Sequence, residues 1–334
     1  MTDPTVPTAA DRIPLAGTDV SIPPLGVGTW AWGDTSTWGM GTTDTSYTID
    51  TIREAWQASL DAGVVLFDTA EVYGKGESER IIGRLLAEDP SVRDRIVLAT
   101  KFMPAPQKLR VTPALVSAAR ASNERLGVEC VDLYQIHGPI SLRSKEALAE
   151  ALVTAQAEGL VKAVGVSNYN AKETRAMDEA LRKRGARLAT NQIEMSLLRT
   201  MPESSGLLAT CRELGVVPLA YSPIGQGRLT GKFSTANPPP KARSFSAHPM
   251  EKVDAVVAVQ RRIAEARDRT PGQVALAWCI AKGAVPIPGA KRRQQAEDNA
   301  GALGWDLTAD ELAELDDVAL GGTRTLQQRF WQHG

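Results

Sequence analysis

VVLFDTAEVYGKGESERIIGRLL, residues 64–86, is the stretch of sequence from which the fold can be deduced. The run 64–67 is apolar at every position, which is typical of a strand buried on both faces of a parallel sheet. Residues 77–86 then carry apolar side chains at helical spacing. A strand and a helix joined by a polar loop make one unit of an α/β protein, so this stretch predicts α/β architecture.

The same alternation of strand and helix extends in both directions along the chain. We expect strands at residues 25–29, 64–67, 96–99, 131–136, 163–166, 188–193, 216–220 and 285–287. We expect helices at residues 52–62, 77–86, 113–126, 145–158, 171–184, 206–214, 271–281 and 308–319. Thr270 is the expected N-cap of the seventh helix, with Pro271 at its first helical position. The alternation predicts one (β/α)8 TIM barrel as a single domain, residues 1–334.

Composition favours small-molecule chemistry. The 334 residues are 43% apolar and carry a formal net charge of -1, which argues against a nucleic-acid partner. The three cysteines lack C-x-x-C spacing and the three histidines lack ligand spacing, so we predict no disulfide framework and no metal site. Residues 1–12 contain no signal-peptide core and are expected to be flexible. No run is apolar enough to span a membrane, so we expect a cytoplasmic protein.

Polar residues end three consecutive predicted strands. Asp68 and His137 directly follow the predicted strands 64–67 and 131–136, Lys101 follows the strand 96–99 after Thr100, and Tyr73 lies in the loop after Asp68. The carboxyl ends of barrel strands meet at the face where barrel enzymes place their active sites. Taken singly, these residues also suit a helix cap, a solvated lysine and a packed tyrosine. Taken together, they favour a catalytic site.

The four side chains suit the reduction of a carbonyl group. Negative charge grows on the carbonyl oxygen as hydride reaches its carbon, so the reaction needs a proton donor beside that oxygen. The phenol of Tyr73 can donate the proton, although an ordinary pKa of about 10 makes it a weak acid. We expect Lys101 to lower this pKa, Asp68 to keep Lys101 charged and oriented, and His137 to position the carbonyl.

These motifs resemble the aldo-keto reductase family. The likeness runs from residue 25 to residue 299, and its strongest parts are FDTAEVYG at 67–74 and LYQIH at 133–137. The resemblance implies a (β/α)8 barrel that uses NADPH. It also implies a catalytic tetrad with Tyr73 as the acid, which agrees with the chemical interpretation: Asp68, Tyr73, Lys101 and His137.

The resemblance further implies how the nicotinamide is held. Residues that match Ser167, Asn168 and Gln192 bind the carboxamide in the family, and the ring that matches Tyr221 stacks on the nicotinamide. From the residues alone, a strand-terminal turn and core packing are the alternatives. The predicted cofactor contacts are Gly28, Thr29, Trp30, Asp68, Ser167, Asn168, Gln192, Tyr221, Ser222, Pro223, Ile224, Gln226, Gly227, Leu229, Gly231, Lys232, Ile287, Gly289, Lys291, Arg292, Gln295, Asp298 and Asn299.

A long loop at residues 222–250 is expected to cover the cofactor. Its first part, SPIGQGRLTGK at 222–232, supplies glycine amides and two cations and resembles the family's pyrophosphate-covering loop. Its glycine spacing is not that of a P-loop. Together with residues 29–34, the segment 221–227 is most similar to a bacterial and plastid subgroup near the pyridoxal reductases.

A second anion site is expected after the eighth strand. IPGAKR at 287–292 precedes a helix start, which is the usual phosphate position of a barrel. Lys291 and Arg292 are expected to hold the 2′-phosphate of NADPH. The sequence departs there from a common family pattern, so NADH remains an alternative cofactor; the departures are at Gly289, Ala290 and Gln295.

Aromatic residues are expected to wall the substrate pocket. The predicted pocket residues are Trp30, Trp32, Tyr73 and His137. Trp38 belongs to the same glycine-rich cluster, and core or rim packing is the alternative for these tryptophans. Gly138 predicts a pocket that is wider beside the histidine. For the tail at 330–331, folding over the pocket and disorder both remain open.

We predict an enzyme that reversibly reduces an aldehyde or ketone to an alcohol with NADPH, with Tyr73 as general acid. Its expected partner is a small carbonyl compound. A cofactor-binding regulatory subunit with little turnover is the alternative. An isomerase or aldolase with Lys101 as a Schiff-base lysine is a third hypothesis.

Overall fold

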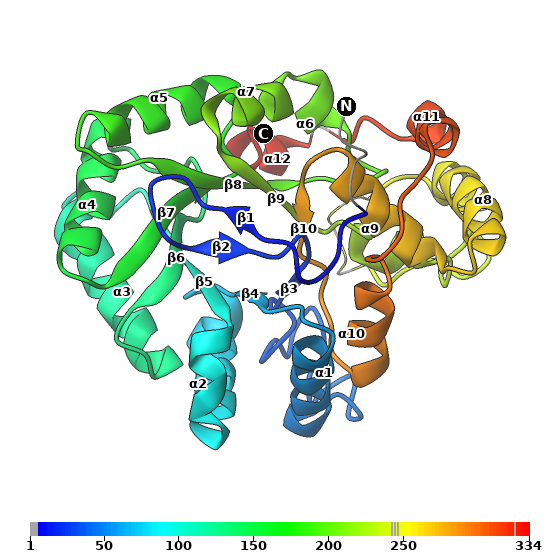
Figure 1. Ribbon diagram of the computed structural model, residues 1–334, viewed down its shortest axis with the longest axis horizontal. Helices are drawn as coiled ribbons and strands as arrows, with labels where there is room; N and C mark the ends of the chain where they lie inside the picture. Colours follow the sequence, from blue (N-terminus) through cyan, green and yellow to red (C-terminus); the bar gives the residue numbers. More distant parts are fainter. Residues whose placement is uncertain (1–5, 242, 244, 246, 324) are drawn as a thin grey trace.

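The computed structural model describes residues 6–241, 243, 245, 247–323 and 325–334. A sheet of eight parallel strands, in the order β3 to β10, lies at its centre (Figure 1). The strands are β3 (Gly26–Gly28), β4 (Leu66–Asp68), β5 (Val97–Phe102), β6 (Val131–Ile136), β7 (Val161–Ser167), β8 (Leu188–Glu194), β9 (Val217–Tyr221) and β10 (Val285–Pro286). A parallel bridge between Gly28 and Gly289 joins the first strand to the last. The predicted (β/α)8 barrel is therefore confirmed.

Helices surround the sheet (Figure 1). They are α1 (Ile49–Asp61), α2 (Glu77–Glu88), α3 (Val111–Leu126), α4 (Lys145–Ala157), α5 (Ala171–Arg182), α6 (Met201–Ser204), α7 (Leu207–Leu214), α8 (Met250–Ala266), α9 (Pro271–Ala281), α10 (Arg293–Ala300), α11 (Ala309–Val318) and α12 (Leu326–Trp331). Short 3-10 helices are η1 (Tyr73–Gly76), η2 (Pro90–Arg95) and η3 (Gly225–Thr230). The predicted cap of α9 is confirmed, since the Thr270 side chain accepts from the Gln273 amide. Helix α8 was not predicted.

A two-stranded hairpin closes one end of the barrel. Strands β1 (Ile13–Pro14) and β2 (Ser21–Ile22) pair antiparallel and cross the middle of the view in Figure 1. Leu15, Val20 and Ile22 of this hairpin pack in one buried cluster with inward-facing strand residues such as Leu66 and Leu133. Because apolar side chains fill the barrel interior at this end, a ligand site has to be built at the other end.

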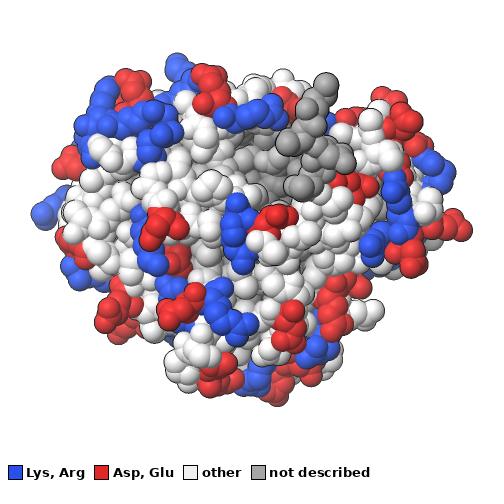
Figure 2. All heavy atoms as spheres, in the orientation of Figure 1, with Lys and Arg blue, Asp and Glu red and all other residues white. Residues whose placement is uncertain are grey.

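The surface carries charges of both signs. On the face drawn in Figure 2, Lys and Arg side chains are interspersed with Asp and Glu. Within the described residues, no helix has the length and apolar character needed to cross a membrane. The same residues contain no group of three or more His, Cys, Asp or Glu side chains able to hold a metal ion.

Candidate active site

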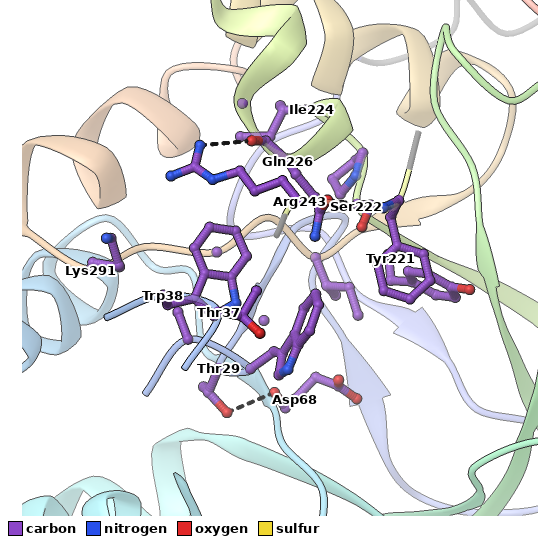
Figure 3. A pocket seen from close by; sticks show the side chains of 18 of the residues that line it. Thr29, Thr37, Trp38, Asp68, Tyr221, Ser222, Ile224, Gln226, Arg243 and Lys291 are labelled. Atoms are coloured by element: carbon purple, nitrogen blue, oxygen red, sulfur yellow. Dashed lines mark hydrogen bonds between the residues drawn. The ribbon is translucent and has the colours of Figure 1, made fainter. Parts of the chain in front are cut away.

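A cavity of about 880 Å³ opens at the carboxyl ends of the strands. Its walls come from the ends of β3, β4, β7, β8 and β9 and from the loops that follow them. Figure 3 shows Tyr221 and Lys291 on opposite sides of the cavity, with Trp38, Gln226 and Arg243 between them. The cavity therefore has two ends with different chemistry.

Lys101 and Asp68 form a buried ion pair at the floor of the site. Lys101 Nζ lies 2.5 Å from Asp68 Oδ1 and 2.7 Å from the backbone oxygen of Thr69. The side-chain amides of Gln135 and Gln192 donate to Asp68 Oδ2 at 3.2 and 2.8 Å. The lysine and aspartate side chains are 0% and 2% exposed. Since β4 and β5 are adjacent, the sheet itself holds the two charges together.

Tyr73 begins the turn η1 and contacts this ion pair. Its Oη lies 3.5 Å from Lys101 Nζ, and Gly74, at a φ of 55°, bends the chain directly after it. Burial raises the pKa of Tyr73 well above its ordinary value, and the charge of Asp68 raises it further. The predicted net lowering of this pKa by Lys101 is wrong, because burial and the charge of Asp68 outweigh the effect of the ammonium. The phenol therefore keeps its proton.

His137 presents a neutral ring to the same space. Its ring centroid lies 5.6 Å from that of Tyr73 at an interplanar angle of 78°. Burial lowers the pKa of His137 well below its ordinary value, and the charge of Lys101 lowers it further. The buried Nδ1 atom has no hydrogen-bond partner among the described residues. A neutral imidazole with unused hydrogen-bonding capacity suits the binding of an uncharged polar group.

His137 is expected to make the protein less stable in acid. Its folded pKa is depressed, whereas the unfolded chain takes up the proton near pH 6.5. Below about pH 6.5 the unfolded state therefore binds an extra proton, and the free energy of unfolding falls by up to about 1.4 kcal/mol per pH unit. Urea denaturation from about pH 7 to about pH 5 should show a steeper loss for wild type than for His137→Asn. Parallel losses would contradict the depressed pKa.

A polar network leads from Asp68 to Tyr221. Gln192 donates to Asp68, and the backbone oxygen of Gln192 accepts from Ser167 Oγ at 2.9 Å. Asn168 donates to Ser167 Oγ at 3.1 Å and accepts from Tyr221 Oη at 2.9 Å. Asn168 has a left-handed backbone, with φ at 64°, a conformation that asparagine tolerates better than most residues. All five residues line the cavity.

Residues near the end of the chain fold over the cavity. The Trp331 ring lies 5.5 Å from that of His137, and Gln332 Nε2 donates to Tyr221 Oη at 2.7 Å. A Cβ atom on Gly138 would come within 3.1 Å of the Trp331 ring. The prediction of a wider pocket beside His137 is therefore wrong, because the indole of Trp331 fills the space that Gly138 leaves.

The opposite end of the cavity is rich in cations. Those that line it are Lys232, Arg243, Lys291 and Arg292. Burial lowers the pKa of Lys232, and the charges of the other three lower it further. Trp38 Nε1 and Gln226 Nε2 are buried N–H donors with no partner within the described part of the chain. Clustered cations and unused donors are what a ligand with several phosphates requires.

Most of the predicted cofactor contacts line this cavity. They are Gly28, Thr29, Trp30, Asp68, Ser167, Asn168, Gln192, Tyr221, Ser222, Pro223, Ile224, Gln226, Gly227, Lys232, Ile287, Gly289, Lys291, Arg292, Gln295, Asp298 and Asn299. Leu229 and Gly231 do not line it. Leu229 is fully buried in the core, and the Gly231 oxygen accepts from Arg261 at 2.8 Å. Lys101 lies behind Asp68 and Tyr73 rather than on the wall.

The prediction that Trp32 walls the pocket is wrong. Its side chain is fully buried, and its Nε1 donates to the Ala290 oxygen at 2.8 Å. The ring packs against Trp56 and Phe67, with centroids 6.4 and 6.3 Å away. Trp30 and Trp38 line the cavity instead. The glycine-rich loop therefore directs its tryptophans both into the core and into the site.

Several lining residues were not predicted from any motif. They include Thr37, Asp44, Met103, Arg243, Phe245, Thr270 and Gln273. Arg243 and Phe245 belong to the long loop that follows β9, and the Phe245 ring lies 5.6 Å from Trp30 and 5.8 Å from Tyr221. The position of Arg243 and Phe245 depends on the conformation of that loop. Residues 231–249 contain no sequence motif that predicts this conformation.

Known proteins resemble this chain in sequence and in structure. Residues 24–320 match the sequence profile described as "Aldo/keto reductase family". The chloroplastic pyridoxal reductase of Arabidopsis thaliana is 36% identical over 324 residues, which cover 94% of this chain and 87% of that protein. Glycerol dehydrogenase from Gluconobacter oxydans superposes with a TM-score of 0.78 at 29% identity, covering 95% and 98% of the two chains. An aldo-keto reductase from Klebsiella pneumoniae, solved in complex with NADPH, superposes with a TM-score of 0.71 at 26% identity, covering 92% and 94%.

Proposed function

The chain belongs to the aldo/keto reductase family of oxidoreductases, and from that premise we propose that it reversibly reduces an aldehyde or ketone to an alcohol with NADPH. The observation that carries this proposal is the contact between the phenol of Tyr73 and the ammonium of Lys101, 3.5 Å apart. The phenol lines a cavity large enough for a small ligand beside a dinucleotide. A half-buried, protonated phenol beside a cation is a suitable proton donor.

The residues of the cavity fit NADPH. When bound, the cofactor would supply hydride to the carbonyl carbon. Ser167, Asn168 and Gln192 would hold its carboxamide, and the ring of Tyr221 would lie against the nicotinamide. The fit rests on the cations of the opposite end and on the unpaired N–H donors of Trp38 and Gln226. The NADPH complex of the Klebsiella relative supports the same cofactor, and NADH remains the alternative.

Each residue of the site would have its own part in the transfer of a proton to the carbonyl oxygen. Tyr73 would give its proton to the carbonyl oxygen as negative charge develops there. Lys101 would stabilise the phenolate that is left, and its ion pair with Asp68 would keep it in place. His137, neutral and facing Tyr73, would orient the carbonyl oxygen by a hydrogen bond. Positioned acid catalysis of this kind contributes about 10²–10⁴-fold in rate.

A binding and turnover experiment tests the proposal. The purified protein is titrated with NADPH by cofactor fluorescence and then supplied with a carbonyl panel that contains nitrobenzaldehyde and pyridoxal, the latter because of the pyridoxal reductase relative. We expect saturable binding and loss of NADPH absorbance with at least one aldehyde. Tight binding without turnover across the panel would favour a regulatory subunit instead. Borohydride trapping of substrate on Lys101 would favour the Schiff-base hypothesis.

A further inference from the structure

An acidic side chain, Asp44, lies among the cations of the cavity. Its two carboxylate oxygens each lie 3.1 Å from Arg292 Nη2, and one lies 3.5 Å from Lys291 Nζ. Ser46 Oγ donates to it at 2.7 Å. The hydrogen bond from Ser46 and the charges of Arg292 and Lys291 lower the pKa of Asp44 to about 2. The carboxylate is therefore ionised throughout the neutral pH range.

The fold holds Asp44 in this position. Its backbone N–H donates to the Gly39 oxygen at 2.9 Å, and its own oxygen accepts from Gly41 and Tyr47 at 3.3 and 3.1 Å. Tyr47 is fully buried and donates through Oη to the Ala31 oxygen at 2.8 Å. Because three backbone hydrogen bonds and a buried anchor fix the loop, the contact with the two cations is a feature of the fold rather than a chance meeting of flexible side chains.

The partners of Asp44 are Lys291 and Arg292, which we expect to hold the 2′-phosphate of NADPH. A phosphate monoester carries about −1.5 to −2 charges at neutral pH. At Lys291 and Arg292 it meets a carboxylate that already accepts from Lys291 Nζ and Arg292 Nη2, so it either displaces the carboxylate from these two nitrogens or lies beside a like charge. NADH has a ribose hydroxyl at this position, and a carboxylate can accept a hydrogen bond from that hydroxyl.

We propose that Asp44 is a specificity-determining residue for the dinucleotide. It competes with the 2′-phosphate for Lys291 and Arg292, which lowers the affinity for NADPH relative to the affinity for NADH. The inference rests on the proposed function, since it requires a nicotinamide dinucleotide in the cavity. It concerns one side chain of the loop between β3 and α1.

The test compares Asp44→Asn with wild type. Asparagine keeps one oxygen that can accept from Ser46, removes the negative charge, and places an NH2 group where the second carboxylate oxygen had faced the cations. Asp50→Asn is the matched control, because it removes one negative charge from a side chain that is 76% exposed and pairs with Arg53 on the surface. Dissociation constants are measured by fluorescence for NADPH and NADH, and by calorimetry for adenosine 2′,5′-bisphosphate and adenosine 5′-phosphate.

We expect Asp44→Asn to bind NADPH and the bisphosphate about tenfold more tightly, which is about 1.4 kcal/mol, and NADH and adenosine 5′-phosphate within about twofold of wild type. Asp50→Asn should match wild type for all four ligands. An equal gain for NADH, or no gain for NADPH, would overturn the role of Asp44. If Asp44→Asn fails to fold by circular dichroism, Asp44→Ser is put to the same comparison.

Arg292→Ala separates this inference from the proposed function. If Arg292→Ala weakens NADPH binding while Asp44→Asn leaves it unchanged, the competition by Asp44 is wrong and the cofactor assignment stands. If wild type binds neither dinucleotide nor the bisphosphate, the proposed function fails, and the inference fails with it.

Discussion

Replacement of Tyr73 by phenylalanine is expected to lower kcat by about 10²–10⁴-fold. The change removes only the hydroxyl that lies 3.5 Å from Lys101. The ring contacts with Trp30 and His137, at centroid distances of 6.5 and 5.6 Å, are retained. The cavity should therefore keep its shape, and the dissociation constant of NADPH should stay at the wild-type value. Steady-state turnover of a reactive aldehyde and fluorescence titration of the cofactor measure the two quantities.

Tyr134→Phe is the matched control for this variant. Tyr134 is fully buried, whereas Tyr73 is half-buried, and the Tyr134 hydroxyl has no hydrogen-bond partner among the residues that the structure describes. It lies on β6 and does not line the cavity. Loss of this hydroxyl should leave turnover near wild type. Near-normal turnover in Tyr73→Phe as well would mean that another group, or water, supplies the proton.

That the four tetrad residues lie close together could be predicted from the sequence. Asp68, Lys101 and His137 follow consecutive apolar runs, and parallel strands of a barrel end on one face. Once the strands are placed, the three side chains have to meet, whatever conformation the loops adopt. Tyr73 is only five residues beyond Asp68, so the loop has little freedom to carry it elsewhere.

The predictions that were wrong or incomplete concern residues whose side-chain direction is determined by long loops. Trp30, Trp32 and Trp38 share one glycine-rich segment, and the sequence contains nothing that separates the core residue Trp32 from the other two. Its role is decided by the distant Ala290 oxygen that accepts from its indole. Asp44 was missed for the same reason, since its cation partners lie more than two hundred residues away in the chain.

The protonation state of Tyr73 also depends on the distances from Lys101 Nζ to Asp68 and to the phenol. The spacing of these residues in the sequence does not give those distances. A lysine beside a phenol lowers its pKa when the ammonium is free to act on it. Here Asp68 lies 2.5 Å from the ammonium and the phenol 3.5 Å, so burial outweighs the cation. In the proposed mechanism, Lys101 would therefore stabilise the negative charge that appears on Tyr73 only when the proton has left.

Replacement of Lys101 by methionine is expected to reduce both stability and turnover. Methionine is of similar length, but among the described residues it leaves the carboxylate of Asp68, 2% exposed, with only the side-chain amides of Gln135 and Gln192 as partners. An uncompensated buried charge of this kind costs about 3–5 kcal/mol. Urea denaturation should show that loss in the free energy of unfolding. Turnover should fall as well, because no cation remains to stabilise the phenolate of Tyr73.

The double variant Asp68→Asn with Lys101→Met separates the two effects. Removing both charges leaves a neutral amide among neutral partners, so most of the lost stability should return, while turnover stays low because the cation is still absent. Lys101→Arg keeps a cation in the buried space and should be more active than Lys101→Met if it folds. Restored turnover in the double variant would mean that Lys101 acts only as the structural partner of Asp68, and the ammonium would then have no part in the proton transfer.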